Sequence, residues 1–190
     1  APVRDIWPLS PLQEGLFFHA GYDQTALDVY TAQDALDFDR ELDADRLRSV
    51  CVRILRENPG MRTGFTSDGL SRPVQFVAEL DDIPLHEIDL TGVDSAEQQQ
   101  RMGELLDDDR RRRFDLADPP LFRMLLIHLG PERDRLVITR HLILWDGWSE
   151  NLFLRELCAR YDGDVEHRGT RSYRDYLEWL AGQDTEDAIS

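Results

Sequence analysis

The sequence predicts an α/β fold of the α+β kind, in which helices pack on a mixed β-sheet to form one lobe. Three observations favour it. Apolar residues recur at helical spacing in several segments, other segments are β-branched or aromatic runs bounded by turn residues, and the two kinds alternate along the chain. With 190 residues and 41% hydrophobic content, the chain can bury one sizeable core. We expect one lobe over residues 1–182, with residues 183–190 beginning a linker or a frayed tail.

The first elements are a short helix and a strand. Ser10 is a candidate N-cap, Pro11 suits the first helical position, and Gln13 follows the cap by three residues, as in a capping box. We expect a helix to begin there. Residues 28–38 then contain β-branched and aromatic positions before another helix start, which predicts a strand.

A second helix and a hairpin follow. The helix has one apolar face, made by Leu47, Val50, Cys51, Ile54 and Leu55. Pro59 and Gly60 end it. Two strands are predicted within residues 61–67 and 72–80, joined by a turn at Ser67, Asp68 and Gly69.

The second half combines a polar helix, a strong hairpin and two amphipathic helices. The polar helix covers residues 95–113 and ends in four arginines, which we interpret as a solvated helix end. Two apolar strands around a turn make residues 121–144 the strongest hairpin signal, leading into Trp-Asp-Gly-Trp-Ser. Ser149 is a candidate cap for the next helix. A last helix is predicted over residues 172–182.

Composition excludes several classes of function. A net charge of -16 would repel a nucleic acid. No apolar run is long enough to cross a bilayer, and the first residues do not resemble a signal peptide, so we expect no membrane partner and a cytoplasmic protein. Cys51 and Cys158 lie on apolar helix faces and are expected to be buried thiols rather than a disulfide. No histidine pair has metal-ligand spacing, so no metal site is predicted.

Among the five histidines, only His141 lies beside other functional candidates. It ends a predicted strand five residues before Asp146, in the segment TRHLILWDGWS. Taken alone, a strand histidine near an Asp-Gly turn is more often a core residue than a catalytic one. The segment becomes specific only together with others.

Four segments in order resemble the motifs of nonribosomal peptide synthetase condensation domains. WPLSPLQEGLFFH resembles the opening motif, in the version common in domains whose donor ends in a D-residue. RENPGMRTGF resembles the second motif, and FDLADPPLFRMLLIHLG resembles the stretch before the active-site strand. TRHLILWDGWS resembles the HHxxxDG motif with its common Thr-His-His-His lead.

The resemblance implies the chloramphenicol acetyltransferase-like fold, with two similar lobes in a V and the active site at their junction. This sequence corresponds to the first lobe, so the second lobe is expected to be absent from it. Partners implied are donor and acceptor carrier proteins, whose phosphopantetheine arms enter as substrates, and the missing lobe. No covalently bound cofactor is implied. The family reaction is attack of the acceptor amine on the donor thioester, which forms a peptide bond.

The ungapped alignment places Arg140 at the lead histidine, His141 at the first motif histidine and Leu142 at the second, which serves catalysis in the family. Leucine has neither a donor nor an acceptor. A one-residue slip that moved His141 into the working position would turn its side chain to the other face of the strand. His141 is therefore interpreted as structural.

The rest of the motif is intact. Asp146 matches the family's structural aspartate, which pairs with the arginine of the second motif, here Arg62. Gly147 matches the glycine that lets backbone approach the substrate tunnel. Trp148 and Ser149 match the end of the motif.

Two readings stay open. The chain is the first lobe of a condensation domain, inactive alone and impaired by Leu142, or it is a non-catalytic, X-domain-like module that docks carrier proteins or recruits a tailoring enzyme. A free-standing acetyl-coenzyme A acyltransferase of the same fold has less support, because the four motifs are of synthetase type.

Overall fold

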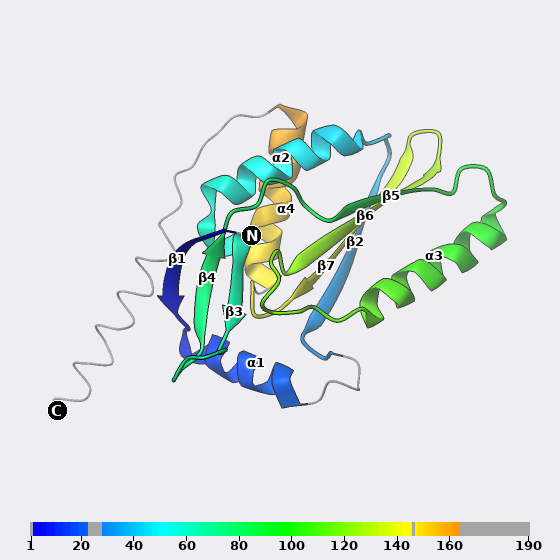
Figure 1. Cartoon of the computed structure of the whole chain (residues 1–190). Coiled ribbons are helices and arrows are strands. Elements are labelled where there is room, and N and C mark those ends of the chain that lie inside the picture. The colour runs from blue at the N-terminus through cyan, green and yellow to red at the C-terminus, as the bar shows by residue number, and fades with distance from the viewer. Residues whose placement is uncertain (1, 23–27, 146, 164–190) are drawn as a thin grey trace.

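The computed structural model describes residues 2–22, 28–145 and 147–163 (Figure 1). The predicted helix over residues 172–182 and the proposed tail lie outside the described residues. The elements follow in the order β1 (Val3–Pro8), α1 (Pro11–Tyr22), β2 (Thr31–Phe38), α2 (Ala44–Glu57), the 3₁₀ helix η1 (Pro59–Arg62), β3 (Thr63–Thr66), β4 (Val74–Ala78), β5 (Leu85–Asp89), α3 (Ser95–Arg111), β6 (Phe122–Gly130), β7 (Arg133–His141) and α4 (Gly147–Asp162).

The strands form two sheets. The smaller has the order β1-β4-β3 and is antiparallel, and the larger has the order β2-β7-β6-β5. The larger sheet is mixed, because β5 runs parallel to β6 while β2, β7 and β6 are antiparallel. A parallel pair needs a crossover connection, and α3 supplies it between β5 and β6. The predicted mixed α/β lobe is confirmed.

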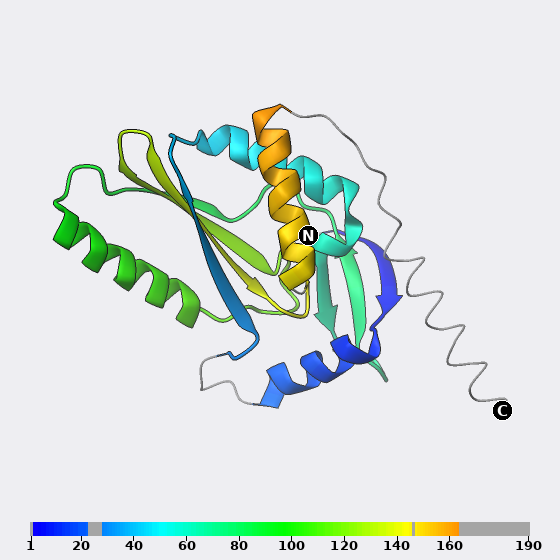
Figure 2. The same ribbon diagram turned by 180° about the vertical axis from the view of Figure 1, so that it is seen from behind.

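Helices cover both faces of the larger sheet. Alternate residues of β6 and β7, such as Met124 and Ile138, pack with α2 and α4 in the main core. Residues of the opposite alternation, such as Leu125 and Val137, pack with the apolar stripe of α3. Figures 1 and 2 show α3 on one side of the sheet, with α2 and α4 across the other. Both faces of β6 and β7 are therefore buried, which explains their nearly continuous apolar sequences.

Most predicted elements are found. The capping box at α1 is present, since the Gln13 N–H donates to Ser10 Oγ over 3.3 Å and the Ser10 N–H donates to Gln13 Oε1 over 3.0 Å. The predicted face of α2 is buried. Both predicted hairpins form, with Thr63 opposite Val77 in one and Phe122 opposite Arg140 in the other.

Four details differ from the predictions. The strand predicted from residue 28 begins at Thr31. Strands β1 and β5 were not predicted. Helix α4 begins at Gly147, so Ser149 lies inside its first turn and the prediction that Ser149 caps the helix is wrong.

Three buried or close contacts fix the packing of these elements. Asp109, near the end of α3, receives hydrogen bonds from Arg123 Nε over 2.7 Å and Thr139 Oγ1 over 2.5 Å, and both acid and arginine are buried. His128 of β6 bridges two carboxylates, those of Glu87 and Asp134, each 2.8 Å from one ring nitrogen.

Gly64 of β3 makes the third contact. A Cβ atom at this position would meet the Phe76 ring and would lie 2.9 Å from Cδ of Pro119. The small sheet can therefore approach the segment before β6 only because residue 64 has no side chain.

Candidate functional site

The segment that resembles the active-site motif leaves the larger sheet at His141. His141 is the last residue of β7, pairs with Thr31 of β2, and is completely buried. Side chains alternate along a strand, so Arg140 faces the opposite way and reaches Glu150 of α4. The prediction that His141 ends a strand is confirmed.

Each nitrogen of the His141 ring has a defined neighbour. Nδ1 accepts the backbone N–H of Ile143 over 3.1 Å. Nε2 lies 3.3 Å from Asp28 Oδ2, but makes no hydrogen bond of normal geometry with any described residue. The ring packs near Tyr30 and edge-on to Phe114, with centroids 6.3 and 6.4 Å away. Burial lowers the pKa of His141; the Asp28 carboxylate opposes this shift and the Arg113 guanidinium adds to it.

These contacts determine the protonation of the ring. Because burial favours the neutral imidazole, one nitrogen carries a hydrogen and the other accepts. Nδ1 is the acceptor, since the N–H of Ile143 points at it, and we therefore assign the hydrogen to Nε2. The only lone pair of the neutral ring is engaged by backbone. With this tautomer, the hydrogen on Nε2 lies on the side of the ring that faces the Asp28 carboxylate.

Leu142 follows directly, outside the strand. Residues 142–144 form a turn, closed by the hydrogen bond from the Leu144 N–H to the His141 carbonyl over 3.0 Å. The Leu142 N–H donates to the Tyr30 carbonyl over 2.8 Å, and its side chain is half-buried. The side chain at this position can pack, but it cannot exchange a proton.

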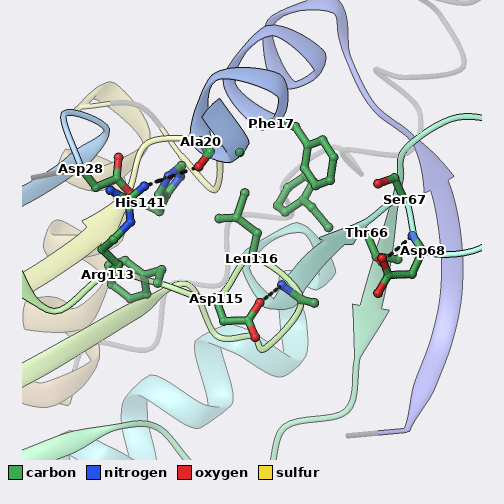
Figure 3. Close-up of a pocket in the computed structure, with 14 residues that line it drawn as sticks. Phe17, Ala20, Asp28, Thr66, Ser67, Asp68, Arg113, Asp115, Leu116 and His141 are labelled. Atoms are coloured by element: carbon green, nitrogen blue, oxygen red, sulfur yellow. Dashed lines mark hydrogen bonds and ion pairs between the residues drawn. The ribbon is translucent and has the colours of Figure 1, made fainter. Parts of the chain in front are cut away.

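A cavity of about 730 Å³ lies beside His141. Figure 3 shows His141, Asp28 and Arg113 at one end and Ser67 and Asp68 at the other, with Leu116 between them. We call it the His141 cavity. Its wall comes from five separated parts of the chain: α1, residue 28, the end of β3 with the two residues after it, the segment between α3 and β6, and the end of β7. It is lined by Phe17, Ala20, Gly21, Asp28, Phe65, Thr66, Ser67, Asp68, Arg113, Phe114, Asp115, Leu116, Ala117 and His141.

The arginine run at the end of α3 is only partly a solvated helix end. Arg110 and Arg111 are exposed, as expected. Arg113 is half-buried, lines the His141 cavity, and has Nη2 3.4 Å from the carbonyl oxygen of Ala20. Composition alone could not separate these roles, because they depend on where the chain turns after Arg111.

A buried charge cluster lies behind the motif. Arg140 Nη1 is 2.5 Å from Glu150 Oε1 and 2.6 Å from Asp34 Oδ2, and the arginine and glutamate side chains are 5% and 7% exposed. Glu150 was not identified from the sequence. The sequence gives only a weak indication of this pair, because Glu150 is one acid in the first turn of a helix and follows an arginine on a buried strand by ten residues.

The pairing predicted between Arg62 and Asp146 stays a prediction, because Asp146 lies outside the described residues. Arg62 donates to two backbone carbonyls, from Nε to Leu55 over 3.0 Å and from Nη1 to Ala78 over 2.8 Å. These bonds tie the end of α2 to β4. Gly147 and Trp148 begin α4, and Ser149 is exposed.

Two further features bear on the kind of site. Within the described ranges, no group of three or more His, Cys, Asp or Glu residues is arranged to hold a metal ion. No helix in that part of the chain is both long and apolar enough to span a membrane. Cys51 is buried and Cys158 half-buried, and both are free thiols; burial raises the pKa of Cys51 to about 12.

Comparison with known proteins identifies the family. A linear gramicidin synthase of Brevibacillus parabrevis is 35% identical over 191 residues, covering 98% of this chain and 4% of that protein. Among solved structures, the starter condensation domain of rhizomide synthetase has a TM-score of 0.82 at 18% identity, covering 98% of this chain and 45% of that one.

The first condensation domain of the calcium-dependent antibiotic synthetase has a TM-score of 0.78 at 24% identity, covering 97% of this chain and 44% of that one. This chain therefore spans less than half of each of these structures and a small fraction of its curated relative. A family model described as "Condensation domain" matches residues 3–190. The chain belongs to the condensation domain family of nonribosomal peptide synthetases.

Proposed function

We propose that this chain is the N-terminal lobe of a condensation domain that retains the architecture of the active site but lacks its base. The whole domain would act on thioesters carried by two carrier proteins. The amine of the acceptor attacks the donor carbonyl, a C–N bond forms, the C–S bond breaks, and the proton lost by the amine ends on the departing thiol. Phosphopantetheine arms would bring both substrates in.

The observation that carries this proposal is the pair of residues at the histidine positions. Proton transfer or stabilisation of the tetrahedral intermediate needs a side chain with a donor or a free lone pair. Leu142 has neither, and the Nδ1 lone pair of His141 is engaged by the N–H of Ile143. Both facts support low peptide-bond formation. The preference for a donor ending in a D-residue stays a prediction.

The test uses the complete native domain with loaded donor and acceptor carriers. We expect no more dipeptide than in a control with carriers alone. Leu142→His should raise the rate by about a hundredfold or more, the usual contribution of a positioned acid or base. His141→Ala in the native background should leave the low rate unchanged. Robust turnover by the native domain that is lost on His141→Ala would contradict the proposal.

The same residues favour a second candidate, a non-catalytic module that docks carrier proteins or recruits a tailoring enzyme. Either function is compatible with a condensation-domain fold that has leucine at the proposed position of the catalytic histidine. Carrier binding and turnover distinguish the two candidate functions. If the domain is a non-catalytic module, loaded carriers should bind the Leu142→His variant of the complete domain as tightly as the native domain, and that variant should form no peptide bond. A gain of turnover in Leu142→His would reject the non-catalytic reading.

A further inference from the structure

We propose that Gln13 of α1 and Gln75 of β4 are positioning residues for the turn that follows His141. We call the two side chains the glutamine pair. Leu142 lies in this turn, so the glutamine pair helps to determine where the side chain at position 142 is placed. This role deepens the proposed function and rests on it in one respect, because residue 142 bears on the reaction only if it aligns with the catalytic histidine.

Both side chains of the glutamine pair are buried where α1 meets the end of the small sheet (Figure 2). Gln13 is 7% exposed and Gln75 is completely buried. Glutamine is mostly found at the surface, because each amide has two donor hydrogens and an acceptor oxygen that are costly to bury unpaired. Two adjacent buried amides must therefore bond to each other and to the backbone around them.

The amides of the pair bond to each other and to the backbone after β1 begins. Gln75 Nε2 donates to Gln13 Oε1 over 3.1 Å and to the carbonyl oxygen of Pro8 over 2.7 Å. The backbone N–H of Ser10 also donates to Gln13 Oε1, over 3.0 Å. Because a backbone N–H can only donate, the oxygen of the Gln13 amide must face Ser10. Its NH₂ group therefore faces the other way.

On that other side, Gln13 Nε2 reaches the turn. It lies 3.5 Å from Gln75 Oε1 and 3.5 Å from the carbonyl oxygen of Ile143, so each of its two hydrogens has an acceptor. Ile143 is buried. Water is therefore a poor substitute for the bond that its carbonyl accepts.

This bond completes a clamp on one peptide group of the turn. The Ile143 carbonyl and the Leu144 N–H belong to the same planar peptide group. The N–H donates to the His141 carbonyl over 3.0 Å, and the carbonyl accepts from Gln13. Because the group is held at both ends, its rotation is fixed. The neighbouring peptide group, whose N–H belongs to Ile143, then keeps its bond to His141 Nδ1.

Apolar packing alone would leave this rotation free. Ile143 belongs to a small buried cluster with Leu9, Phe65 and Leu121. Such contacts hold the side chain in place, but the hydrophobic effect has no preferred direction. The glutamine pair supplies the direction. It also brings the segment WPLSPLQEGLFFH into contact with the segment TRHLILWDGWS, two of the four segments that resemble family motifs.

Hydrogen exchange followed by NMR on the full chain tests this role. In the native chain, the side-chain amide hydrogens of the glutamine pair should exchange at least about tenfold more slowly than those of the exposed Gln99. Gln13→Leu keeps a similar volume but cannot donate to the Ile143 carbonyl. It should raise exchange of the Ile143 and Leu144 amides about fivefold relative to the Ile138 amide of β7, as for loss of one neutral hydrogen bond.

Gln98→Leu is the matched control. Gln98 is also 7% exposed, and its Nε2 donates to two backbone carbonyls, those of Leu90 and Leu129, over 2.9 and 2.8 Å. Its loss should lower global stability while changing the exchange ratio between the turn and β7 by about twofold or less. The ¹⁵N shift of His141 Nδ1 should move in Gln13→Leu and stay unchanged in Gln98→Leu.

Three results would overturn the positioning role. They are an unchanged exchange ratio in Gln13→Leu, an equal change of that ratio in the two variants, and native Gln13 side-chain hydrogens that exchange as fast as those of Gln99. The third result needs no variant, so the role stays testable if Gln13→Leu does not fold.

The positioning role and the proposed function can fail separately. If the turn responds to Gln13→Leu as expected but the complete native domain forms peptide bonds, the positioning role stands and the proposed loss of the base is wrong. If the native domain is inactive and gains activity in Leu142→His, but the exchange ratio does not change in Gln13→Leu, the function stands and the positioning role is wrong.

Discussion

Replacing Glu150 by glutamine should remove a pH-dependent part of the stability. Glu150 lies in the first turn of α4, 2.5 Å from Arg140 Nη1, and only 7% of its side chain is exposed. The same arginine nitrogen contacts Asp34, which is half exposed. One cation therefore faces two carboxylates, and the buried carboxylate bears the larger cost of ionisation.

The size and sign follow from the pKa of Glu150. Burial raises it from 4.5 to about 7; Arg140 opposes the shift, and Asp34 adds to it. Below the unfolded pKa, the carboxyl is protonated in both states. Between that value and about 7, the unfolded chain has lost the proton while the folded chain keeps it. The free energy of unfolding should therefore fall as pH rises through this window, by up to about 3 kcal/mol.

Urea unfolding of both proteins at about pH 4.5 and pH 8 measures the effect. Glutamine resembles the protonated acid, so Glu150→Gln should match the native chain at the lower pH and exceed it in stability at the higher one. Glu156→Gln is the matched control, since its side chain is 35% exposed and pairs with Arg160 on the same helix; it should change little. A native chain more stable than Glu150→Gln at pH 8 would refute the reasoning.

Three further predictions concern stability, each measured by urea unfolding. Burial opposes protonation of His128, but its two carboxylate neighbours outweigh that effect and raise its pKa. The stabilisation of the folded chain by protonated His128 should be complete below about pH 6.5 and should be lost as pH rises through the raised pKa. His128→Gln should abolish this pH dependence of the free energy of unfolding. Asp109→Asn leaves a buried arginine without its counter-charge and should cost about 3–5 kcal/mol, whereas loss of the surface pair in Arg101→Gln should cost about 0.5 kcal/mol. Gly64→Ala meets a ring and a proline and should cost about 1–3 kcal/mol, while Gly92→Ala, with open space around it, should be nearly neutral.

The elements that could be predicted from sequence are those whose own residues determine them. The buried face of α2 repeats at helical spacing, and the β6–β7 hairpin joins two long apolar runs by a turn. Strands β1 and β5 were missed because they are short edge strands, six and five residues long, and their pairing partners are distant in sequence. Neither has a periodicity that distinguishes it from a loop.

The same distinction applies to the site. The end of the strand at His141 and the apolar residue after it follow from the local sequence. Asp28 could not be assigned to this histidine, because 113 residues separate them along the chain and the contact requires β2 to pair with β7. Arg113 was expected in solvent for a similar reason: its position depends on the path between α3 and β6.

The geometry also bears on the proposal that Leu142 occupies the position of the second motif histidine. Arg140, which we align with the family's lead histidine, faces α4 and donates hydrogen bonds to Glu150 and Asp34. His141 faces the cavity on the opposite side of the strand, with its lone pair engaged. Leu142 lies beyond the last paired residue, in the turn. Because successive side chains enter different environments, neither Arg140 nor His141 can place a hydrogen-bond donor or acceptor where the Leu142 side chain lies. Under the proposed alignment, we therefore expect that only a change at residue 142 itself raises the rate of peptide-bond formation.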